Sequence, residues 1–215
     1  MLAKINLPML FARWTKDKMA KLYFKYGAMG CSKSAQALIT KFNYEERGMK
    51  VLLLKPSIDT RDGATAVRSR IGLEQQAVTV AGDVNLYDLY VNNYRDADVI
   101  IVDECQFLAP DQVDDLNQIV IDFDLPVLCF GLATDFLTHL FPGSRRLFEI
   151  ADSIQEIKSV CKCGGKATIN ARLDDEGNVV FSGDQVCIGG NERYIAMCKK
   201  CWLKAKREHD AKLKA

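Results

Sequence analysis

The stretch LYFKYGAMGCSKS, residues 22–34, decides the fold of this chain. It begins with an apolar run, passes through Gly27 and Gly30, and ends in Lys33 and Ser34 where a segment of helical period begins. A strand, a glycine-containing loop and a helix that carries Lys-Ser together make a phosphate-binding loop, whose pattern is GxxxxGK[ST]. In such a loop the backbone N–H groups converge on the phosphates, the lysine reaches the β- and γ-phosphates, and the hydroxyl binds Mg²⁺. The pattern predicts a phosphate site formed by Gly27, Ala28, Met29, Gly30, Cys31, Ser32, Lys33 and Ser34.

Ser32 departs from the pattern, because it occupies the place of the second glycine. If its backbone must adopt a positive φ, the Cβ costs roughly 1–2 kcal/mol, which corresponds to a loss in nucleotide affinity of about 5–30-fold. If the Cβ pushes on the phosphates instead, the loss is greater. Both possibilities stay open, as does a strand-to-helix turn that contains Lys-Ser by chance.

Six short apolar runs recur along the chain, and segments of helical length separate several of them. The predicted strands are residues 21–26, 50–55, 77–80, 98–104, 126–132 and 153–159, and the predicted helices are 34–48, 84–96 and 109–123. Strands that are apolar on both faces and alternate with helices are typical of a parallel sheet covered on both sides. The predicted fold class is therefore α/β, with a P-loop (RecA-like) parallel sheet as its core.

The chain divides into four predicted regions. Residues 1–18 are interpreted as an N-terminal extension, for which disorder is one interpretation, and 19–158 as a P-loop ATP-binding domain. After residue 159 the sequence becomes rich in glycine and turns, so 159–205 is predicted to be a second, small module that needs a metal to hold it. Residues 206–215 are a polar tail that frays or forms a short solvated helix.

Charge and hydropathy exclude several classes of function. The 215 residues include 29 Lys and Arg against 28 Asp and Glu, so the net charge is +1 and no global field favours nucleic acid or a membrane surface. The N-terminal apolar stretch is interrupted by Pro8 and lacks a small-residue cleavage pattern, so it is a poor secretory signal. We therefore expect a cytoplasmic location, no nucleic-acid partner and no membrane partner.

Four of the eight cysteines form two close pairs, Cys161-x-Cys163 and Cys198-x-x-Cys201. Both histidines lie outside the pairs, so an all-cysteine tetrahedral zinc site is the natural prediction. Unmetallated thiols and, last, a disulfide stay open as alternatives. A nucleic-acid zinc finger is also possible, but the charge balance and the lack of a basic helix between the pairs count against it.

The second chemical signal is VIIVDECQF, residues 99–107. Asp103 and Glu104 follow an apolar strand, which places them at the carboxyl edge of the sheet, where open α/β sheets bind ligands. Adjacent strand residues point to opposite faces, so one carboxylate can hold hydrated Mg²⁺ while the other faces an acceptor. An acidic pair at a strand end can also be a solvated edge, but with the phosphate loop it forms a two-part nucleotide site.

The sequence resembles the zinc-containing, tetrameric thymidine kinases that many bacteria and the animal cytosol contain. The matching stretches follow the family's order from about residue 20 to 202: LYFKYGAMGCSKS, NYEERGMKV, SRIGL, VDECQFL, PVLCFGLATDF and IGGNERY, followed by Cys198 and Cys201. The resemblance implies transfer of the ATP γ-phosphoryl to the 5′-hydroxyl of thymidine or deoxyuridine, in deoxynucleoside salvage, with Mg²⁺. It also implies a homotetramer, inhibition by dTTP bound in the substrate site, and a small C-terminal zinc-binding lasso domain.

The resemblance also implies roles for single residues. Glu104 matches the general base, and Asp103 and Ser34 match the Mg²⁺ ligands. The ATP site would further include Asp59, Arg61 and Gln106, with Arg61 steadying the transferred phosphoryl, unless it forms an ordinary loop ion pair. The nucleoside pocket would be formed by Met29, Phe107, Leu132, Phe136 and Phe141, for which core packing is the alternative, and by Cys187, Ile188, Gly189 and Tyr194 of the lasso loop. Cys161, Cys163, Cys198 and Cys201 would bind zinc at the feet of that loop, although many members have Cys-x-x-Cys in the first pair.

Three alternatives to this function remain: a nucleoside kinase of shifted specificity, a plain ATPase, and a catalytically impaired nucleotide- or nucleoside-binding relative in which Ser32 marks decay of the ATP loop. The catalytically impaired relative is disfavoured, because a site that has lost its function would be expected to lack some of its other functional groups as well. Here Lys33, Ser34, Asp103 and Glu104 are all present, with Tyr194.

Overall fold

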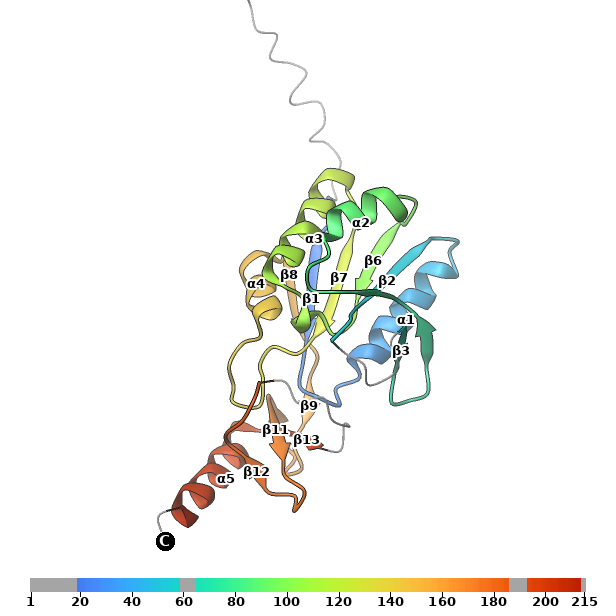
Figure 1. Ribbon diagram of the computed structural model, residues 1–215. Helices are drawn as coiled ribbons and strands as arrows, with labels where there is room; N and C mark the ends of the chain where they lie inside the picture. The colour runs from blue at the N-terminus through green and yellow to red at the C-terminus, as the bar shows by residue number, and fades with distance from the viewer. Residues whose placement is uncertain (1–18, 59–64, 186–192, 214–215) are drawn as a thin grey trace, which may run out of the picture.

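A six-stranded parallel sheet forms the centre of the molecule (Figure 1). The computed structural model describes residues 19–58, 65–185 and 193–213. In spatial order the strands are β5 (Val78–Val80), β2 (Val51–Pro56), β6 (Val99–Val102), β7 (Val127–Gly131), β1 (Leu22–Tyr26) and β8 (Ser153–Glu156). All neighbouring pairs are parallel. Each of the six predicted strands is present, and the predicted α/β class is confirmed.

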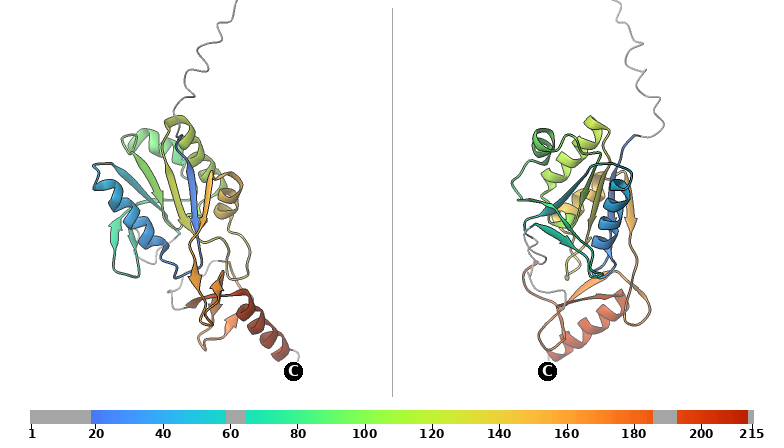
Figure 2. Two further views of the ribbon diagram at one scale, coloured as in Figure 1. Left: turned by 180° about the vertical axis from the view of Figure 1, so that it is seen from behind. Right: turned by 90° about the vertical axis from the view of Figure 1, so that its right-hand side faces the viewer.

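Helices cover both faces of this sheet, as Figure 2 shows in its right-hand view. The helix α1 (Lys33–Glu45) lies on one face, and α2 (Leu86–Asn93), α3 (Pro110–Phe123) and α4 (Pro142–Ile150) lie on the other. Successive residues of β2 alternate between the two cores: Leu52 and Leu54 pack with α2 and α3, whereas Leu53 packs with α1. This explains why β2 carries apolar residues at successive positions.

Besides the single 3-10 turn η2 (Cys105–Phe107), two elements of the main domain were not predicted. The helix α4 begins with Pro142-Gly143, which resembles a turn in sequence, yet proline is favoured in the first helical turn. The glycine allows close packing, since a Cβ on Gly143 would lie 2.7 Å from the carbonyl oxygens of Cys105 and Leu108. The second element is an antiparallel hairpin of β3 (Ala66–Arg68) and β4 (Glu74–Gln76), whose short, largely exposed strands lack an apolar run.

The C-terminal part lies beyond the carboxyl edge of the main sheet (Figure 1). It contains a pair of short strands, β9 (Ser159–Val160) and β10 (Lys166–Ala167), and a three-stranded sheet of β12 (Val179–Val180), β11 (Ile169–Leu173) and β13 (Tyr194–Met197). The last helix, α5 (Lys199–Lys212), packs Trp202 against Ile169 and Ala171. The predicted boundary at residue 205 therefore falls inside a helix, and the proposed four-region division stays a prediction.

Residues 1–18 lie outside the described part of the chain, so the interpretation of this extension is not tested. Among the helices that the structure describes, none combines the length and the apolar character needed to cross a lipid bilayer.

Candidate functional site

The phosphate loop connects β1 to α1 at the carboxyl edge of the sheet, in the context that the sequence predicts. Gly27 begins the loop, and its N–H donates to the carbonyl of Gly131 at 3.3 Å. A Cβ at Gly27 would lie 2.4 Å from the carbonyl oxygen of Ile157 and 2.6 Å from the Cys31 sulfur, so only glycine fits here. The loop is thereby held against the ends of two neighbouring strands.

Ser32 has a left-handed backbone, with φ of 65° and ψ of 29°. Of the two effects considered for this serine, the positive φ is therefore the one that the structure shows. Gly30, with φ of 76°, takes a similar conformation without a Cβ. The left-handed backbone of Ser32 destabilises the folded chain, because this conformation costs a non-glycine residue roughly 1–2 kcal/mol.

Replacement of Ser32 by glycine is expected to stabilise the protein slightly. The relief of roughly 1–2 kcal/mol is partly offset by the greater freedom of glycine in the unfolded chain, about 0.5–1 kcal/mol. The net gain of about 0–1.5 kcal/mol raises Tm by up to about 6 °C, measured by calorimetry. Ser32→Ala, which keeps the Cβ and loses only the hydroxyl, is the control. A Tm for Ser32→Gly below that of Ser32→Ala would show that the backbone of Ser32 carries no such strain, because only the entropy cost of glycine would then remain.

Lys33 is buried and holds the loop from inside. Its Nζ donates to the carbonyl oxygens of Gly27 at 3.2 Å and Ala28 at 3.1 Å. It also borders a cavity of about 290 Å³ beside the loop. An ammonium in this place can reach an anionic group in the cavity.

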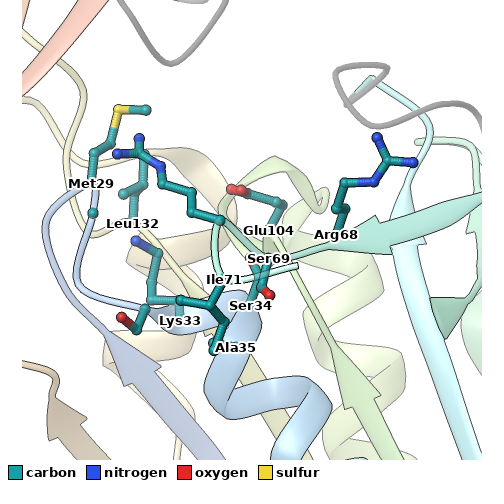
Figure 3. A pocket seen from close by; sticks show the side chains of 12 residues that line it. Met29, Lys33, Ser34, Ala35, Arg68, Ser69, Ile71, Glu104 and Leu132 are labelled. Atoms are coloured by element: carbon teal, nitrogen blue, oxygen red, sulfur yellow. The ribbon is translucent and has the colours of Figure 1, made fainter. Parts of the chain in front are cut away.

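The cavity brings together four segments that are distant in sequence (Figure 3). They are the phosphate loop with the first turn of α1, the β3–β4 hairpin, and the residues that directly follow β6 and β7. The lining residues are Met29, Gly30, Ser32, Lys33, Ser34, Ala35, Arg68, Ser69, Arg70, Ile71, Glu104 and Leu132. Cations, hydroxyls and one carboxylate thus face a single space, as a site for a phosphorylated ligand requires.

Asp103 follows β6 and is almost fully buried, at 3% exposure. Burial, together with the nearby charge of Glu104, raises the pKa of Asp103 to about 7, although the Ser34 hydroxyl and Lys33 oppose this shift. The Ser34 hydroxyl hydrogen-bonds to the carboxylate, while Oδ1 is buried and has no hydrogen-bond partner in the described residues. A carboxylate oxygen left without a partner beside a serine hydroxyl is the donor set that Mg²⁺ prefers, so these two residues fit the ion.

Glu104 borders the cavity and has a left-handed backbone, with φ of 52°. Such strain in a non-glycine residue is typical of functional positions. The amide of Gln106 donates to Oε2 of Glu104 at 2.5 Å, and its own oxygen accepts the Leu132 N–H at 2.9 Å. Gln106 is 1% exposed and lies behind Glu104, so it orients the carboxylate. The phosphate contact predicted for Gln106 stays a prediction.

Of the five residues predicted for the nucleoside pocket, Met29 and Leu132 line the cavity, whereas Phe107, Phe136 and Phe141 are not among its lining residues. Phe107 and Phe141 form an edge-to-face pair with centroids 5.6 Å apart, and Leu132 and Met29 border the cavity itself. Phe136 is 1% exposed, and the guanidinium of Arg172 lies 3.7 Å from its ring centroid. The five residues predicted to form the nucleoside pocket thus lie in the loops that follow β1, β6 and β7.

Arg172 and Asn170 of β11 join the C-terminal part to these loops, and neither was singled out from the sequence. Arg172 donates to the carbonyls of Ser182 and Asp184, each at 2.9 Å, while it stacks on Phe136. Asn170 accepts the N–H of Met29 at 2.8 Å and donates to the carbonyl of Thr134 at 2.9 Å. The phosphate loop, the loop that follows β7 and the segment at Ser182 and Asp184 are therefore all hydrogen-bonded to one strand, β11.

Five predicted site residues lie outside the described part of the chain: Asp59, Arg61, Cys187, Ile188 and Gly189. Their roles stay predictions. Tyr194, which begins β13, is described and pairs with Arg172 in register, so it stands at the foot of the lasso loop.

The four paired cysteines come together, as predicted. The sulfurs of Cys161, Cys163, Cys198 and Cys201 all lie within 4.8 Å of one another. Tetrahedral coordination with Zn–S bonds of about 2.3 Å separates sulfurs by about 3.8 Å, which matches the cluster. Backbone N–H groups of Cys163 and then Cys198 lower the pKa of Cys161 to about 6, which favours the thiolate that binds metals. The cluster therefore fits a structural metal ion, and the Cys-x-Cys spacing does not prevent it.

A parallel sheet whose first strand leads into a Lys-Ser phosphate loop, with an acidic pair two strands away, defines a P-loop nucleotide-binding protein. Comparison with known proteins narrows the class: a family model described as thymidine kinase matches residues 20–202. A thymidine kinase of Yersinia pseudotuberculosis is 46% identical over 189 residues, covering 87% of this chain and 96% of the relative. The thymidine kinase of phage T4 is 47% identical over 186 residues, covering 86% of this chain and 96% of the relative. The thymidine kinase of Zymomonas mobilis is 46% identical over 187 residues, covering 86% of this chain and 97% of the relative. The chain belongs to the thymidine kinase family.

Proposed function

We propose that this chain is an ATP-dependent thymidine kinase that transfers the γ-phosphoryl group to the 5′-hydroxyl of thymidine or deoxyuridine. The observation that carries the proposal is the cavity where Lys33 and Ser34 face Glu104, next to the buried Asp103. Family membership supports the same reaction. The product, dTMP, would serve deoxynucleoside salvage.

In this mechanism Glu104 is the general base. The 5′-hydroxyl gives its proton to the carboxylate as its oxygen forms a bond to the γ-phosphorus, and the bond from that phosphorus to the β,γ-bridging oxygen breaks to release ADP. A positioned base contributes typically about 10²–10⁴ in rate. Gln106 keeps the carboxylate turned toward the cavity. Lys33 and the N–H groups of the loop position the phosphates and neutralise their charge.

Ser34 and Asp103 would hold Mg²⁺, because they offer a hydroxyl and a buried carboxylate oxygen without a partner among the described residues. The ion supplies charge neutralisation at the phosphates when bound. The thymine base would lie between aromatic and apolar walls formed by Met29, Phe107, Leu132, Phe136 and Phe141. Tyr194 and the predicted lasso residues Cys187, Ile188 and Gly189 would complete the pocket.

Zinc is the proposed occupant of the cysteine cluster. Elemental analysis of the purified protein is expected to find about one zinc per chain. Cys198→Ser is expected to lose the metal and to lower Tm, because the cluster joins β9, β10 and the start of α5. Cys129→Ala is the matched control, since it removes a core thiol of β7 and should keep the zinc. A wild-type protein with four titratable thiols and no zinc would contradict the assignment.

We also propose, on the family resemblance, that the protein is a homotetramer and that dTTP inhibits it from the substrate site. The exposed apolar side chains Ile39 and Phe42 of α1 offer surface for contact between subunits. Thiolate-bound zinc suits a reducing compartment, which agrees with the cytoplasm.

The test of the proposed function is a phosphoryl-transfer assay with Mg-ATP across thymidine, deoxyuridine and deoxycytidine. Thymidine and deoxyuridine are expected to react and deoxycytidine to react poorly. A preference for deoxycytidine would indicate a kinase of shifted specificity. ATP hydrolysis without nucleoside phosphorylation would indicate a plain ATPase, and nucleotide binding without turnover a catalytically impaired relative.

A further inference from the structure

The tip of the β3–β4 hairpin places a second cationic group at the phosphate cavity. The tip is the SRIGL segment, residues 69–73, whose sequence matches the family but has no role in the mechanism above. Arg70 of this segment borders the same cavity as Lys33 and Glu104. The two sides of the cavity therefore come from different parts of the chain, the phosphate loop and the hairpin.

The hairpin holds its tip in a defined position. The N–H of Ser69 donates to the carbonyl of Leu73 at 2.8 Å, and the N–H of Leu73 donates to the Ser69 hydroxyl at 3.0 Å. Gly72, with φ of 87°, closes the turn by donating to the carbonyl of Ser69 at 3.1 Å. Val67 anchors β3 in the core beside Leu38 of α1. The backbone of Arg70 is thus fixed relative to the phosphate loop.

The two arginines of the hairpin differ in their partners. Arg68 forms an ion pair with Glu74, in which Nε lies 3.0 Å and Nη2 lies 2.9 Å from Oε2 of the glutamate. Arg70 has neither a hydrogen bond nor an ion pair within the residues that the structure describes, and its side chain is exposed. Its Nη1 lies 3.6 Å from the point where Gly30 would carry a Cβ. A free guanidinium therefore faces the part of the loop where a missing side chain leaves space.

We propose that Arg70 binds the γ-phosphate of the nucleoside triphosphate and stabilises the transferred phosphoryl group. This inference rests on the proposed function, because it assigns a contact within the same site. A guanidinium can donate two parallel hydrogen bonds to phosphate oxygens, which suits a phosphoryl group whose charge is spread over three oxygens. Arg70 and Lys33 border the same cavity, one from the hairpin and the other from the phosphate loop, so both cations would contact the transferred group.

The assignment is tested by nucleotide binding and by kinetics. In Arg70→Ala, affinity for the non-hydrolysable triphosphate AMP-PNP, measured calorimetrically with Mg²⁺, is expected to fall by about tenfold or more, since charge-assisted hydrogen bonds contribute about 1.5–3 kcal/mol. Affinity for ADP, which lacks the γ-phosphate, is expected to change by less than about threefold. The value of kcat for thymidine phosphorylation is expected to fall by about 10²–10³. Arg70→Lys keeps the positive charge but cannot donate two parallel hydrogen bonds, so it should recover part of the AMP-PNP affinity and part of kcat.

Arg47→Ala is the matched control, because it removes an exposed arginine that follows α1 and does not border the cavity. It is expected to bind AMP-PNP within about twofold of the wild type. Equal weakening of AMP-PNP and ADP by Arg70→Ala would overturn the γ-phosphate assignment, as would a loss in Arg47→Ala as large as that in Arg70→Ala. Failure of the wild type to phosphorylate thymidine would refute the proposed function instead, and the comparison of AMP-PNP with ADP would still test Arg70.

Discussion

Replacement of Glu104 by glutamine is expected to lower kcat for thymidine phosphorylation by about 10²–10⁴, the contribution of a positioned general base. The change is nearly isosteric, and the new amide oxygen can still accept the hydrogen bond from Gln106. The site should therefore keep its shape while it loses the group that takes the proton. Thymidine affinity, measured by equilibrium binding, is expected to stay within about threefold of the wild type.

Asp111→Asn provides the control for this variant, because it makes the same carboxylate-to-amide change at an exposed position of α3. Its kcat is expected to stay within about twofold of the wild type. Wild-type activity in Glu104→Gln would remove Glu104 from the role of base. A parallel loss of thymidine affinity would mean that the carboxylate holds the substrate rather than the proton.

Replacement of Asp103 by asparagine is expected to have opposite effects on activity and stability. Loss of a proposed Mg²⁺ ligand should lower kcat/KM for Mg-ATP by about 10²-fold or more, since a bound ion contributes several kcal/mol of transition-state stabilisation. The same change removes a buried carboxylate whose Oδ1 has no hydrogen-bond partner among the described residues. Burial raises the pKa of this carboxylate to about 7. At pH 8 that carboxylate is ionised, so the variant should be more stable than the wild type without added Mg²⁺.

The stability of Asp103→Asn is measured by calorimetry in chelator at pH 8. We expect Tm to rise by at least about 2–4 °C, the shift that corresponds to about 1 kcal/mol in a chain of this size. Mg²⁺ with nucleotide should then raise Tm in the wild type and have little effect on the variant. Ser34→Ala is the companion variant, because it removes the other proposed ligand and keeps the buried charge. A fall in Tm for Asp103→Asn would show that the carboxylate stabilises the fold by itself.

The main sheet could be predicted from the sequence because its strands carry a strong signal. The runs at 50–55 and 98–104 are apolar at successive positions since both faces of β2 and β6 are buried. The β3–β4 hairpin gives no such signal, as β4 is exposed at every position. The helix α4 was missed because Pro142-Gly143 is more typical of a turn, although here the glycine permits contact with the segment that follows β6.

The part of the site that lies within short sequence motifs could be predicted. Lys33 and Ser34 end one motif, and Asp103 and Glu104 end another, so the carboxyl edge of a parallel sheet brings them together. The conformation of Ser32 required coordinates, because its sequence permits more than one effect. The positions of Arg70, Asn170 and Arg172 at the site depend on how the hairpin and β11 approach the loops, and no local sequence pattern encodes that approach.

Asn170 is the clearest example of a contact residue that the sequence alone does not reveal. It is a 3% exposed amide in a short strand, and its sequence context, TINARL, does not distinguish it from an ordinary polar residue. In the structure its two amide atoms satisfy the N–H of Met29 and the carbonyl of Thr134. Both of those residues lie far from it in sequence, so the bridge is visible only once the fold is known.

The most direct test of the central claim follows the γ-phosphoryl group itself. Protein incubated with thymidine, Mg²⁺ and ATP labelled with ¹⁸O in the γ-phosphoryl group is analysed by mass spectrometry. If the phosphate loop, Asp103 and Glu104 form one kinase site, dTMP appears with the label in its 5′-phosphate, and the rate of its formation falls by about 10²–10⁴ in Glu104→Gln. Labelled inorganic phosphate with unchanged thymidine would contradict the account, because it would show that the cavity hydrolyses ATP without using the nucleoside as acceptor.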